Sequence, residues 1–509
     1  TMFARVVAII SDVCEGHKKE VAVLFVLTSI LSRVVYRSWQ SNSSGEEKGE
    51  CKRKQSTSTA PVTAPAGYIE TIRNVASPNA PFFLLEMRLK TARQIFRVNV
   101  PLSGGLYVVS NPDAAREILK DVSCDKPIEI YKPFQSVTGD PGIFTRSTYD
   151  KMWTSVRKST AHSFSSTQVQ RMNRICTEHT EMWLTDRVQS SVNKFGSFVF
   201  DPSEEMTQLT FRSIMESAFE YTSNEQDFET FSHNVEVSLK EFAIKEGGNP
   251  FRFLYKRFDP SYYRALQSSK IAQEFVRKVL NTYRNGNDPK RSDATTLVKI
   301  ICDNKSLTEN QKITELYTFM LAGFDTTGYT LSSTLILLAK HPEVQRKLQR
   351  ELLTLEPVER SKSKYLKCVI NESMRLLPVA ATGSYRKASR DFTFPDEGGG
   401  EIVIPKNAVV AMPFYVQNRD PANFAEPNLF IPERWETNYD KVKGAAIQFA
   451  YGARNCPGQS LAMAELYSTI PKILSEYKLE LEKEGKLDYF LTLKYVGAKL
   501  RASRLESSS

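Results

Sequence analysis

The feature that most constrains this chain is a ten-residue loop that brings one cysteine to the start of a helix. The loop reads FAYGARNCPG, from Phe449 to Gly458, and leads into the helical pattern QSLAMAELYSTIPKIL. Free N–H groups at a helix N-terminus stabilise negative charge, so we expect a lowered pKa and a thiolate at Cys456. Gly452 and Gly458 leave room for a flat ligand. Phe449 can shield the sulfur from water, and Arg454 can pair with a carboxylate of the ligand. An isolated cysteine is usually a buried structural residue, so further motifs are needed to identify Cys456 as a ligand-binding cysteine.

The chain is long enough for a large core around a cofactor, and its periodicity predicts mainly helices. It has 509 residues, of which 41% are hydrophobic. After Lys151 the pattern is mostly helical, as in SKIAQEFVRKVLNTY and TLSSTLILLAKH, whereas ARQIFRVNVP, GLYVVS, EIVIP and LTLKYVGAKL indicate strands. We therefore predict an α+β domain that is mainly α with a smaller β-rich part.

Three segments are expected along the chain. Residues 1–40 contain the apolar stretch Val21–Leu31, flanked by basic residues, which predicts an N-terminal membrane anchor or a targeting segment. Residues 41–67 are polar, rich in Ser and Thr, and end in two prolines, as is typical of a disordered tether. The folded domain is expected over residues 68–504.

Charge and cysteine usage exclude several classes of protein. Lys and Arg number 68 against 58 Asp and Glu, a net charge of +10. No basic run is interleaved with aromatic residues, so we predict no nucleic-acid binding, and the surplus favours a membrane surface or an acidic protein partner. The seven cysteines are scattered without a C-x-x-C pair, and the five histidines are dispersed, which argues against a disulfide scaffold and a zinc site.

Two further motifs lie upstream of the cysteine loop. Glu372 and Arg375 stand three residues apart in a helical pattern and can form an ion pair on one face, although such pairs are usually structural. The segment AGFDTT, residues 322–327, lies inside a long apolar helical pattern. Gly and Thr weaken a helix there, which predicts a local opening; the alternative is a Thr-rich buried helix packed closely on its neighbour.

Taken with PERW at residues 432–435, these motifs resemble those of the cytochrome P450 family. AGFDTT resembles the family's oxygen-binding helix. The motifs follow one another in the family's order: the oxygen-binding helix, E-x-x-R, P-E-R-W and the cysteine loop F-x-x-G-x-R-x-C-x-G. The resemblance spans roughly Tyr68 to Leu500. It implies the cytochrome P450 fold and haem b, iron protoporphyrin IX, as the cofactor. One departure is Asn418, where many relatives have His, and we expect it to change the haem surroundings only modestly.

The resemblance also implies roles for individual residues. Asp325 and Thr326 are the expected catalytic pair, which relays protons during oxygen activation. Cys456 is the expected metal ligand. The other expected cofactor-binding residues are Trp153, Arg157, Arg386, Phe449, Gly452, Arg454 and Gly458. The expected substrate-binding residues are Phe319, Ala322, Gly323, Val379 and Val496. Glu372, Arg375 and Arg434 are expected to form a buried structural network.

The implied activity is that of a haem-thiolate monooxygenase. It would insert one atom of dioxygen into a small lipophilic substrate, by hydroxylation or epoxidation, with electrons from a separate NADPH-dependent reductase or ferredoxin. Two other functions stay open: a reductase-independent haem-thiolate isomerase or dehydratase, and a non-enzymatic haem-binding protein. Asp325 and Thr326 argue against both. The expected location is a membrane, that of the endoplasmic reticulum, with a plastid or another organelle as the alternative.

Overall fold

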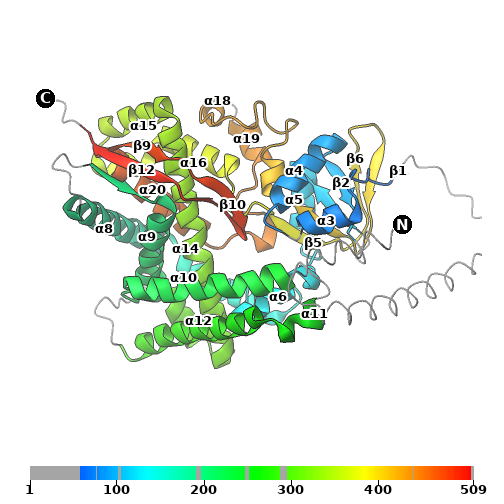
Figure 1. Cartoon of the computed structure of the whole chain (residues 1–509), viewed down its shortest axis with the longest axis horizontal. Coiled ribbons are helices and arrows are strands. Elements are labelled where there is room, and N and C mark those ends of the chain that lie inside the picture. Colours follow the sequence, from blue (N-terminus) through cyan, green and yellow to red (C-terminus); the bar gives the residue numbers. More distant parts are fainter. Residues whose placement is uncertain are drawn as a thin grey trace, which may run out of the picture. The chain divides into compact units, whose positions relative to one another are not determined.

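The long periodic stretches of the sequence become long helices, and the longest, α14, runs through the middle of the fold (Figure 1). A computed structural model describes residues 58–75, 77–100, 105–190, 197–246, 252–286, 295–437 and 439–505. The helices are α3 (Tyr68–Val75), α4 (Ala80–Thr91), α5 (Pro112–Lys120), α6 (Ile128–Thr138), α7 (Lys151–Thr160), α8 (Ser166–Ser190), α9 (Pro202–Phe219), α10 (Glu225–Leu239), α11 (Arg252–Tyr255), α12 (Pro260–Arg284), α13 (Leu297–Asp303), α14 (Glu309–Lys340), α15 (Pro342–Thr354), α16 (Lys364–Leu376), α17 (Phe414–Gln417), α18 (Arg434–Thr437), α19 (Tyr439–Ala445) and α20 (Gln459–Leu474).

Four small sheets accompany the helices. One has the order β2 (Ile95–Val98), β3 (Leu106–Val109), β8 (Val409–Met412), β5 (Ser384–Lys387), and only its β3–β8 pair is parallel. The second has the order β1 (Ser58–Thr59), β7 (Glu401–Ile404), β6 (Phe392–Pro395). The third has the order β4 (Ser197–Phe200), β12 (Lys499–Arg504), β9 (Tyr477–Lys483). The fourth is the hairpin of β10 (Lys486–Phe490) and β11 (Thr492–Val496), which packs against α14.

The ordered domain begins about ten residues earlier than the sequence predicts. Ser58 pairs with Glu401 of β7, and the Ala64 N–H donates to the Arg97 carbonyl at 2.7 Å. Ala64 and Ala66 are both buried, so residues 58–67 belong to the fold and not to the predicted tether. The prolines and small residues of this stretch lack helical or alternating periodicity, so their burial could not be predicted from the pattern. The predicted anchor and the rest of the tether, residues 1–57, lie outside the described residues.

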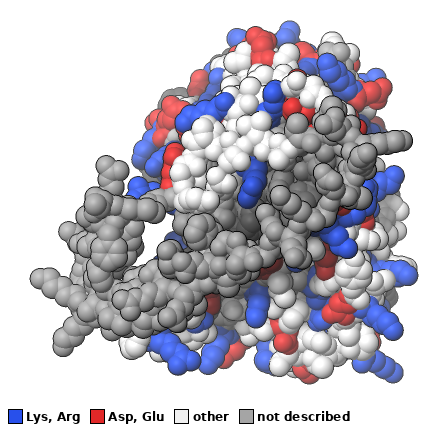
Figure 2. Space-filling model, turned by 90° about the vertical axis from the view of Figure 1, so that its right-hand side faces the viewer, with Lys and Arg blue, Asp and Glu red and all other residues white. Residues whose placement is uncertain are grey.

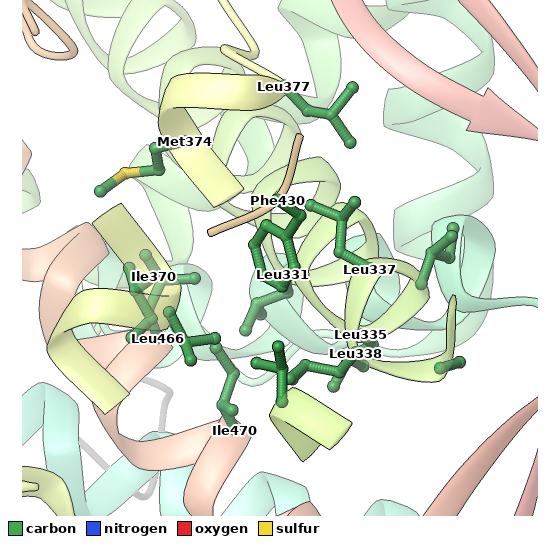
Figure 3. Packing of buried hydrophobic residues seen from close by; sticks show 14 of the residues in the cluster. Leu331, Leu335, Leu337, Leu338, Ile370, Met374, Leu377, Phe430, Leu466 and Ile470 are labelled. Atoms are coloured by element: carbon green, nitrogen blue, oxygen red, sulfur yellow. The ribbon is translucent and has the colours of Figure 1, made fainter. Parts of the chain in front are cut away.

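The core joins α14 to the helix that follows the cysteine loop. Apolar residues occur on all sides of the second half of α14, so this half is buried on all sides. Figure 3 shows part of the largest cluster, in which side chains of α14 lie beside those of α16 and α20: Leu331, Leu335, Leu337, Leu338, Ile370, Met374, Leu466 and Ile470. This packing fixes α14 relative to α20, and therefore relative to the cysteine that precedes α20.

The surface of the described unit carries charges of both signs. On the face in Figure 2, Lys and Arg side chains are scattered among Asp and Glu side chains. Within the described ranges, we find no helix whose length and apolar character would let it cross a bilayer.

Candidate cofactor-binding site

The cysteine loop is held by its own backbone before α20 begins. The Cys456 N–H donates to the Phe449 carbonyl at 2.8 Å, and the Asn455 N–H closes a tight turn on the Gly452 carbonyl at 3.1 Å. Gly458 is the N-cap residue of α20, and a Cβ there would lie 3.9 Å from the Cys456 sulfur. A Cβ at residue 458 would thus be in ordinary van der Waals contact with the sulfur, and the role of Gly458 in cofactor binding stays a prediction.

Gly452 is required for a different reason from the one the sequence suggests. Its φ is +75°, a left-handed conformation, and a Cβ would lie 2.3 Å from the Leu119 carbonyl oxygen at the end of α5. The missing side chain lets the loop pack on α5. The role of Gly452 in cofactor binding stays a prediction.

Cys456 is exposed as a residue, although its sulfur lies among protein atoms. Burial among protein atoms raises the pKa of the Cys456 thiol, while the N–H groups of Gly458 and Gln459 and the charge of Arg157 act in the opposite direction. The helix N-terminus thus acts as predicted, but the predicted net lowering of the pKa is wrong because burial outweighs it.

Arg454 is one of several basic side chains beside the cysteine loop. Its guanidinium stacks on the Trp153 ring at 4.5 Å, and it donates to the carbonyl of Arg146. Asp125 lies 3.6 Å from it, and the Arg454 Nε is buried without a hydrogen-bond partner among the described residues. Trp153 is thus a support for Arg454, and Trp153 is itself buried.

Two more predicted arginines and one unpredicted lysine complete this set. Arg157 donates to the Asn455 side chain of the loop, and the buried Arg386 donates to the Tyr385 carbonyl at 2.8 Å. The ammonium of Lys126 lies 4.2 Å and 4.0 Å from the ring centres of two aromatic residues, Tyr131 and Phe144. Burial, and then the charges of Arg454 and Arg386, hold the pKa of Lys126 well below its usual value.

These cations fit a ligand that carries carboxylates. We call Lys126, Arg386, Arg454 and Asp125 the Arg454 cluster. Asp125 lies 3.6 Å from Arg454 and acts through its charge on all three basic groups. Burial, partly offset by Asp125, lowers the pKa of Arg454 to about 10, and Arg386 adds to the lowering. An additional anion would relieve this repulsion. The donor set therefore fits haem b, with a thiolate for its iron and cations for its two carboxylates.

Helix α14 presents the predicted oxygen segment without a break. The Thr326 hydroxyl donates to the Ala322 carbonyl at 2.8 Å, which is the predicted competition for a backbone acceptor. The helix is nevertheless continuous from Glu309 to Lys340, so the predicted local opening is absent from α14. Thr326 shares a cavity with Val379 and with Phe449 of the cysteine loop. The structure thus brings the oxygen segment and the cysteine loop to one space.

Asp325 faces away from that cavity toward the β10–β11 hairpin. Its Oδ2 accepts a hydrogen bond from the Thr492 hydroxyl at 2.9 Å. Burial raises the pKa of Asp325 to about 6, although the Thr492 hydrogen bond and the charge of Lys494 lower it. A carboxyl group with this pKa can take up and release a proton near neutral pH.

The predicted substrate-binding residues divide into two groups. Ala322 is exposed on α14 and Val379 lines the cavity. Phe319 is buried beside Phe164, with ring centres 6.3 Å apart, and a Cβ on Gly323 would lie 3.0 Å from Ile214. Gly323 therefore serves close packing of α9 on α14.

Val496 is a wrong prediction. It is 49% exposed and pairs with Lys486 at the open end of the β10–β11 hairpin, four residues beyond Thr492. The end that reaches α14 beside Asp325 is the turn, where Phe490 and Leu491 pack against the same apolar cluster as Phe319. The register of a hairpin could not be read from LTLKYVGAKL, so the prediction selected the wrong end.

The structure brings Glu372, Arg375 and Arg434 together. Arg375 binds both Glu372 oxygens at 2.8 Å, and the Arg434 Nε binds Oε1 at 2.9 Å. The Trp435 indole N–H and the Ile431 N–H also donate to this carboxylate, at 2.9 and 3.0 Å. The four side chains Glu372, Arg375, Arg434 and Trp435 form what we call the Glu372 cluster.

Sequence reasoning missed Lys126, Thr492 and the role of Trp435. Thr492 reaches Asp325 across 167 residues, and Lys126 reaches the loop from before α6, so neither belongs to a local motif. Trp435 stands in the quoted PERW segment, where an indole next to Arg434 was an available signal for a buried donor.

Comparisons with known proteins agree with this geometry. A family model described as Cytochrome P450 matches residues 77–500. The chain is 32% identical to Cytochrome P450 4d8 of Drosophila melanogaster, over 43% of this chain and 52% of that protein. It is 30% identical to Probable cytochrome P450 4d21 of the same species, over 71% of this chain and 76% of that protein. It is 34% identical to Cytochrome P450 3A6 of Oryctolagus cuniculus, over 37% of this chain and 38% of that protein. The chain spans about half the length of several curated relatives that it matches, 4d8 among them.

Proposed function

Because the chain belongs to the cytochrome P450 family, we propose that it is a haem-thiolate monooxygenase. The membership confirms the predicted α+β fold and haem b as the cofactor. One observation carries the proposal: Thr326 of α14 and Phe449 of the cysteine loop line a single cavity. An oxygen-handling helix and a thiolate-bearing loop at one space suit oxygen activation.

The residues divide the work between binding and proton handling. When bound, haem supplies the activation of dioxygen with electrons from outside. Cys456 would hold the iron, and the Arg454 cluster would hold the carboxylates. Thr326 would hold a proton donor at its hydroxyl, and Asp325 would exchange protons with solvent. Ala322 and Val379 would orient the substrate.

The proposed substrate is small and lipophilic. The apolar residues that line the cavity support this class: Met374, Pro378, Val379, Phe449, Ala462 and Leu466. The proposed chemistry is hydroxylation or epoxidation. The electrons would come from a separate reductase or ferredoxin, and the exposed Lys441 and Lys443 on α19 suit an acidic partner.

The first test is spectroscopic. The reduced protein under carbon monoxide should show the red-shifted Soret band of thiolate ligation, and Cys456→Ala should lose it. A reductase-supported reaction with a lipid extract should then give products heavier by one oxygen atom. Turnover of hydroperoxides without electrons would instead favour the isomerase or dehydratase, and haem binding without oxygen use would favour a haem-binding protein.

Membrane association rests on the sequence alone. We propose that residues 1–40 anchor the protein to the endoplasmic reticulum membrane and that residues 41–57 act as the tether. Fractionation of cells expressing the full chain and a chain lacking residues 1–40 tests this. Equal recovery of both in the membrane fraction would contradict the anchor.

A further inference from the structure

A second cavity, of about 240 Å³, lies between α8, α9 and the turn that leads into α10. Helices α8 and α9 pack side by side (Figure 1). Met182 of α8 lines the cavity and is 58% exposed, so the cavity opens to solvent beside this residue. None of its lining residues lines the cavity that Thr326 and Phe449 share. Ligand pockets usually measure about 300–1,000 Å³, so this cavity suits a small ligand.

Helix α9 separates this cavity from the oxygen segment of α14. The residues of α9 that line the cavity lie on one face of the helix. On the opposite face, the Thr210 hydroxyl donates to the Phe324 carbonyl of α14 at 2.9 Å. A Cβ on Gly328 of α14 would lie only 2.7 Å from the Thr207 Cα, so α9 packs tightly on α14. A ligand in the cavity would therefore contact α9 from the side away from α14.

The cavity is acidic, although the chain as a whole is basic. Its lining carries three carboxylates, one guanidinium and one imidazole, from Glu205, Glu216, Glu225, Arg212 and His179. The whole chain has a net charge of +10, so the negative charge here is local. Glu205 is only 8% exposed, which means that water does little to solvate its charge. A cationic ligand therefore matches this lining better than an anion does.

The Glu205 carboxylate is incompletely compensated by its neighbours. The Trp183 indole N–H donates to its Oε2 at 2.7 Å, and the Arg187 Nε lies 2.8 Å from the same oxygen. Burial outweighs both partners and raises the pKa of Glu205. A further positive charge in the cavity would stabilise the ionised carboxylate.

The arrangement of the lining residues favours an organic cation over a metal ion. Glu205 and Glu216 are about three helical turns apart on α9, too far to share one ion. Over the described residues, no group of three or more His, Cys, Asp or Glu side chains could hold a metal ion. The apolar side chains of Met182, Trp183 and Leu209 line the same cavity. An ammonium group with an apolar body can contact these side chains while its charge lies beside a carboxylate.

We propose that this cavity binds a small organic cation, with its ammonium group beside Glu205 and its apolar body against Trp183 and Leu209. The ligand class is an ammonium group that carries short alkyl groups or an aromatic ring. Trp183 has two roles in this site: its N–H orients the carboxylate, and its ring attracts the cation. The site shares no lining residue with the cavity at the cysteine loop, so it does not depend on the proposed monooxygenase activity.

Isothermal titration calorimetry of the haem-loaded protein with benzyltrimethylammonium tests the site. This quaternary ammonium ion has no lone pair, so it cannot coordinate the haem iron. We expect saturable binding of one cation per chain. Phenylacetate, an aromatic anion, should bind about tenfold or more weakly, because the lining carboxylates repel it. Equal binding of the two ions, or no saturable binding of the cation, would overturn the proposal.

Two variants locate the bound cation. Glu205→Gln removes the charge at nearly constant shape and should weaken binding about tenfold or more. Met182→Lys places a positive charge at the mouth of the cavity and should also weaken binding. Because Met182 is exposed, this variant carries the test should Glu205→Gln not fold.

Glu178→Gln is the matched control. It removes a carboxylate from the exposed side of α8, outside the cavity lining, and its affinity should stay within about twofold of the wild type. Wild-type affinity in the folded Glu205 and Met182 variants would show that the cation binds elsewhere and would overturn the proposal. An equal loss in Glu178→Gln would do the same, since the effect would then reflect only the overall charge.

Discussion

Two of the buried ion clusters among the described residues are built in opposite ways. In the Glu372 cluster one carboxylate accepts five hydrogen bonds from two arginines, one indole and one backbone N–H. In the Arg454 cluster three basic side chains share the charge of one carboxylate, Asp125, and the Arg454 Nε has no hydrogen-bond partner among the described residues. The first cluster is complete within the chain, as a scaffold requires. The second has excess positive charge, as a site for an anionic ligand requires.

Two buried glutamates extend the comparison. Burial raises the pKa of Glu372, but its arginine partners outweigh burial and lower the pKa overall. Glu315 of α14 accepts from the Ile143 N–H at 2.9 Å, while the Arg146 guanidinium is 3.8 Å away. Burial therefore raises the pKa of Glu315 to about 7. Arg146 also accepts a hydrogen bond from Arg454 through its carbonyl, so Glu315 lies beside the incomplete cluster.

The largest effect is expected from breaking the complete cluster. Glu372→Gln leaves two arginines and an indole without the charge they bind, at a cost of about 3–5 kcal/mol in the free energy of unfolding. Urea unfolding monitored by circular dichroism measures it. The exposed Glu356→Gln is the control and should stay within about 0.5 kcal/mol of the wild type. Similar values for both variants would show that the Glu372 cluster is not a scaffold.

Glu315, beside the Arg454 cluster, should make the free energy of unfolding depend on pH. Glu315 holds its proton in the folded state up to pH about 7, against 4.5 for the ordinary carboxyl group. Between these values the folded state binds more protons than the unfolded state, so stability falls as the pH rises. The full loss corresponds to about 3 kcal/mol.

Glu315→Gln tests this dependence. Denaturant unfolding at several pH values between 5 and 8 should show the decline in the wild type and a flatter profile in the variant. An unchanged slope would mean that Glu315 does not titrate in this range.

The sequence predicts the complete cluster far better than the incomplete one. Glu372 and Arg375 are one helical turn apart, so local periodicity reveals their pairing. The adjacent Asp125 and Lys126, Arg386 and Arg454 come from three separate parts of the chain, and they meet only because β5 and the segment before α6 converge on the cysteine loop. The contact of the β10–β11 hairpin with α14 is equally non-local, which explains both the missed Thr492 and the misplaced Val496.

Removing one basic side chain from the Arg454 cluster should weaken haem binding, which the Glu372 cluster does not serve. Arg454→Met or Lys126→Met should speed haem release about ten- to a hundredfold, because each removes a charge-assisted contact. The haem-free protein should unfold at an equal or higher urea concentration, since repulsion within the Arg454 cluster falls. Haem transfer to an acceptor globin and urea unfolding give the two values. The exposed Lys305→Met is the control, and faster haem release in it would contradict the assignment.

The smallest effect is expected from the loss of one hydrogen bond within the Glu372 cluster. Trp435→Phe keeps an aromatic ring but removes the indole N–H that donates to Glu372 at 2.9 Å. Four donors to the carboxylate persist, so no charge is left unpaired, and we expect a loss of only about 1–2 kcal/mol in urea unfolding. If Trp435→Phe cost as much as Glu372→Gln, the indole would be needed to complete the cluster. The contrast between the clusters would then lie in the number of hydrogen bonds, and not in the balance of charge.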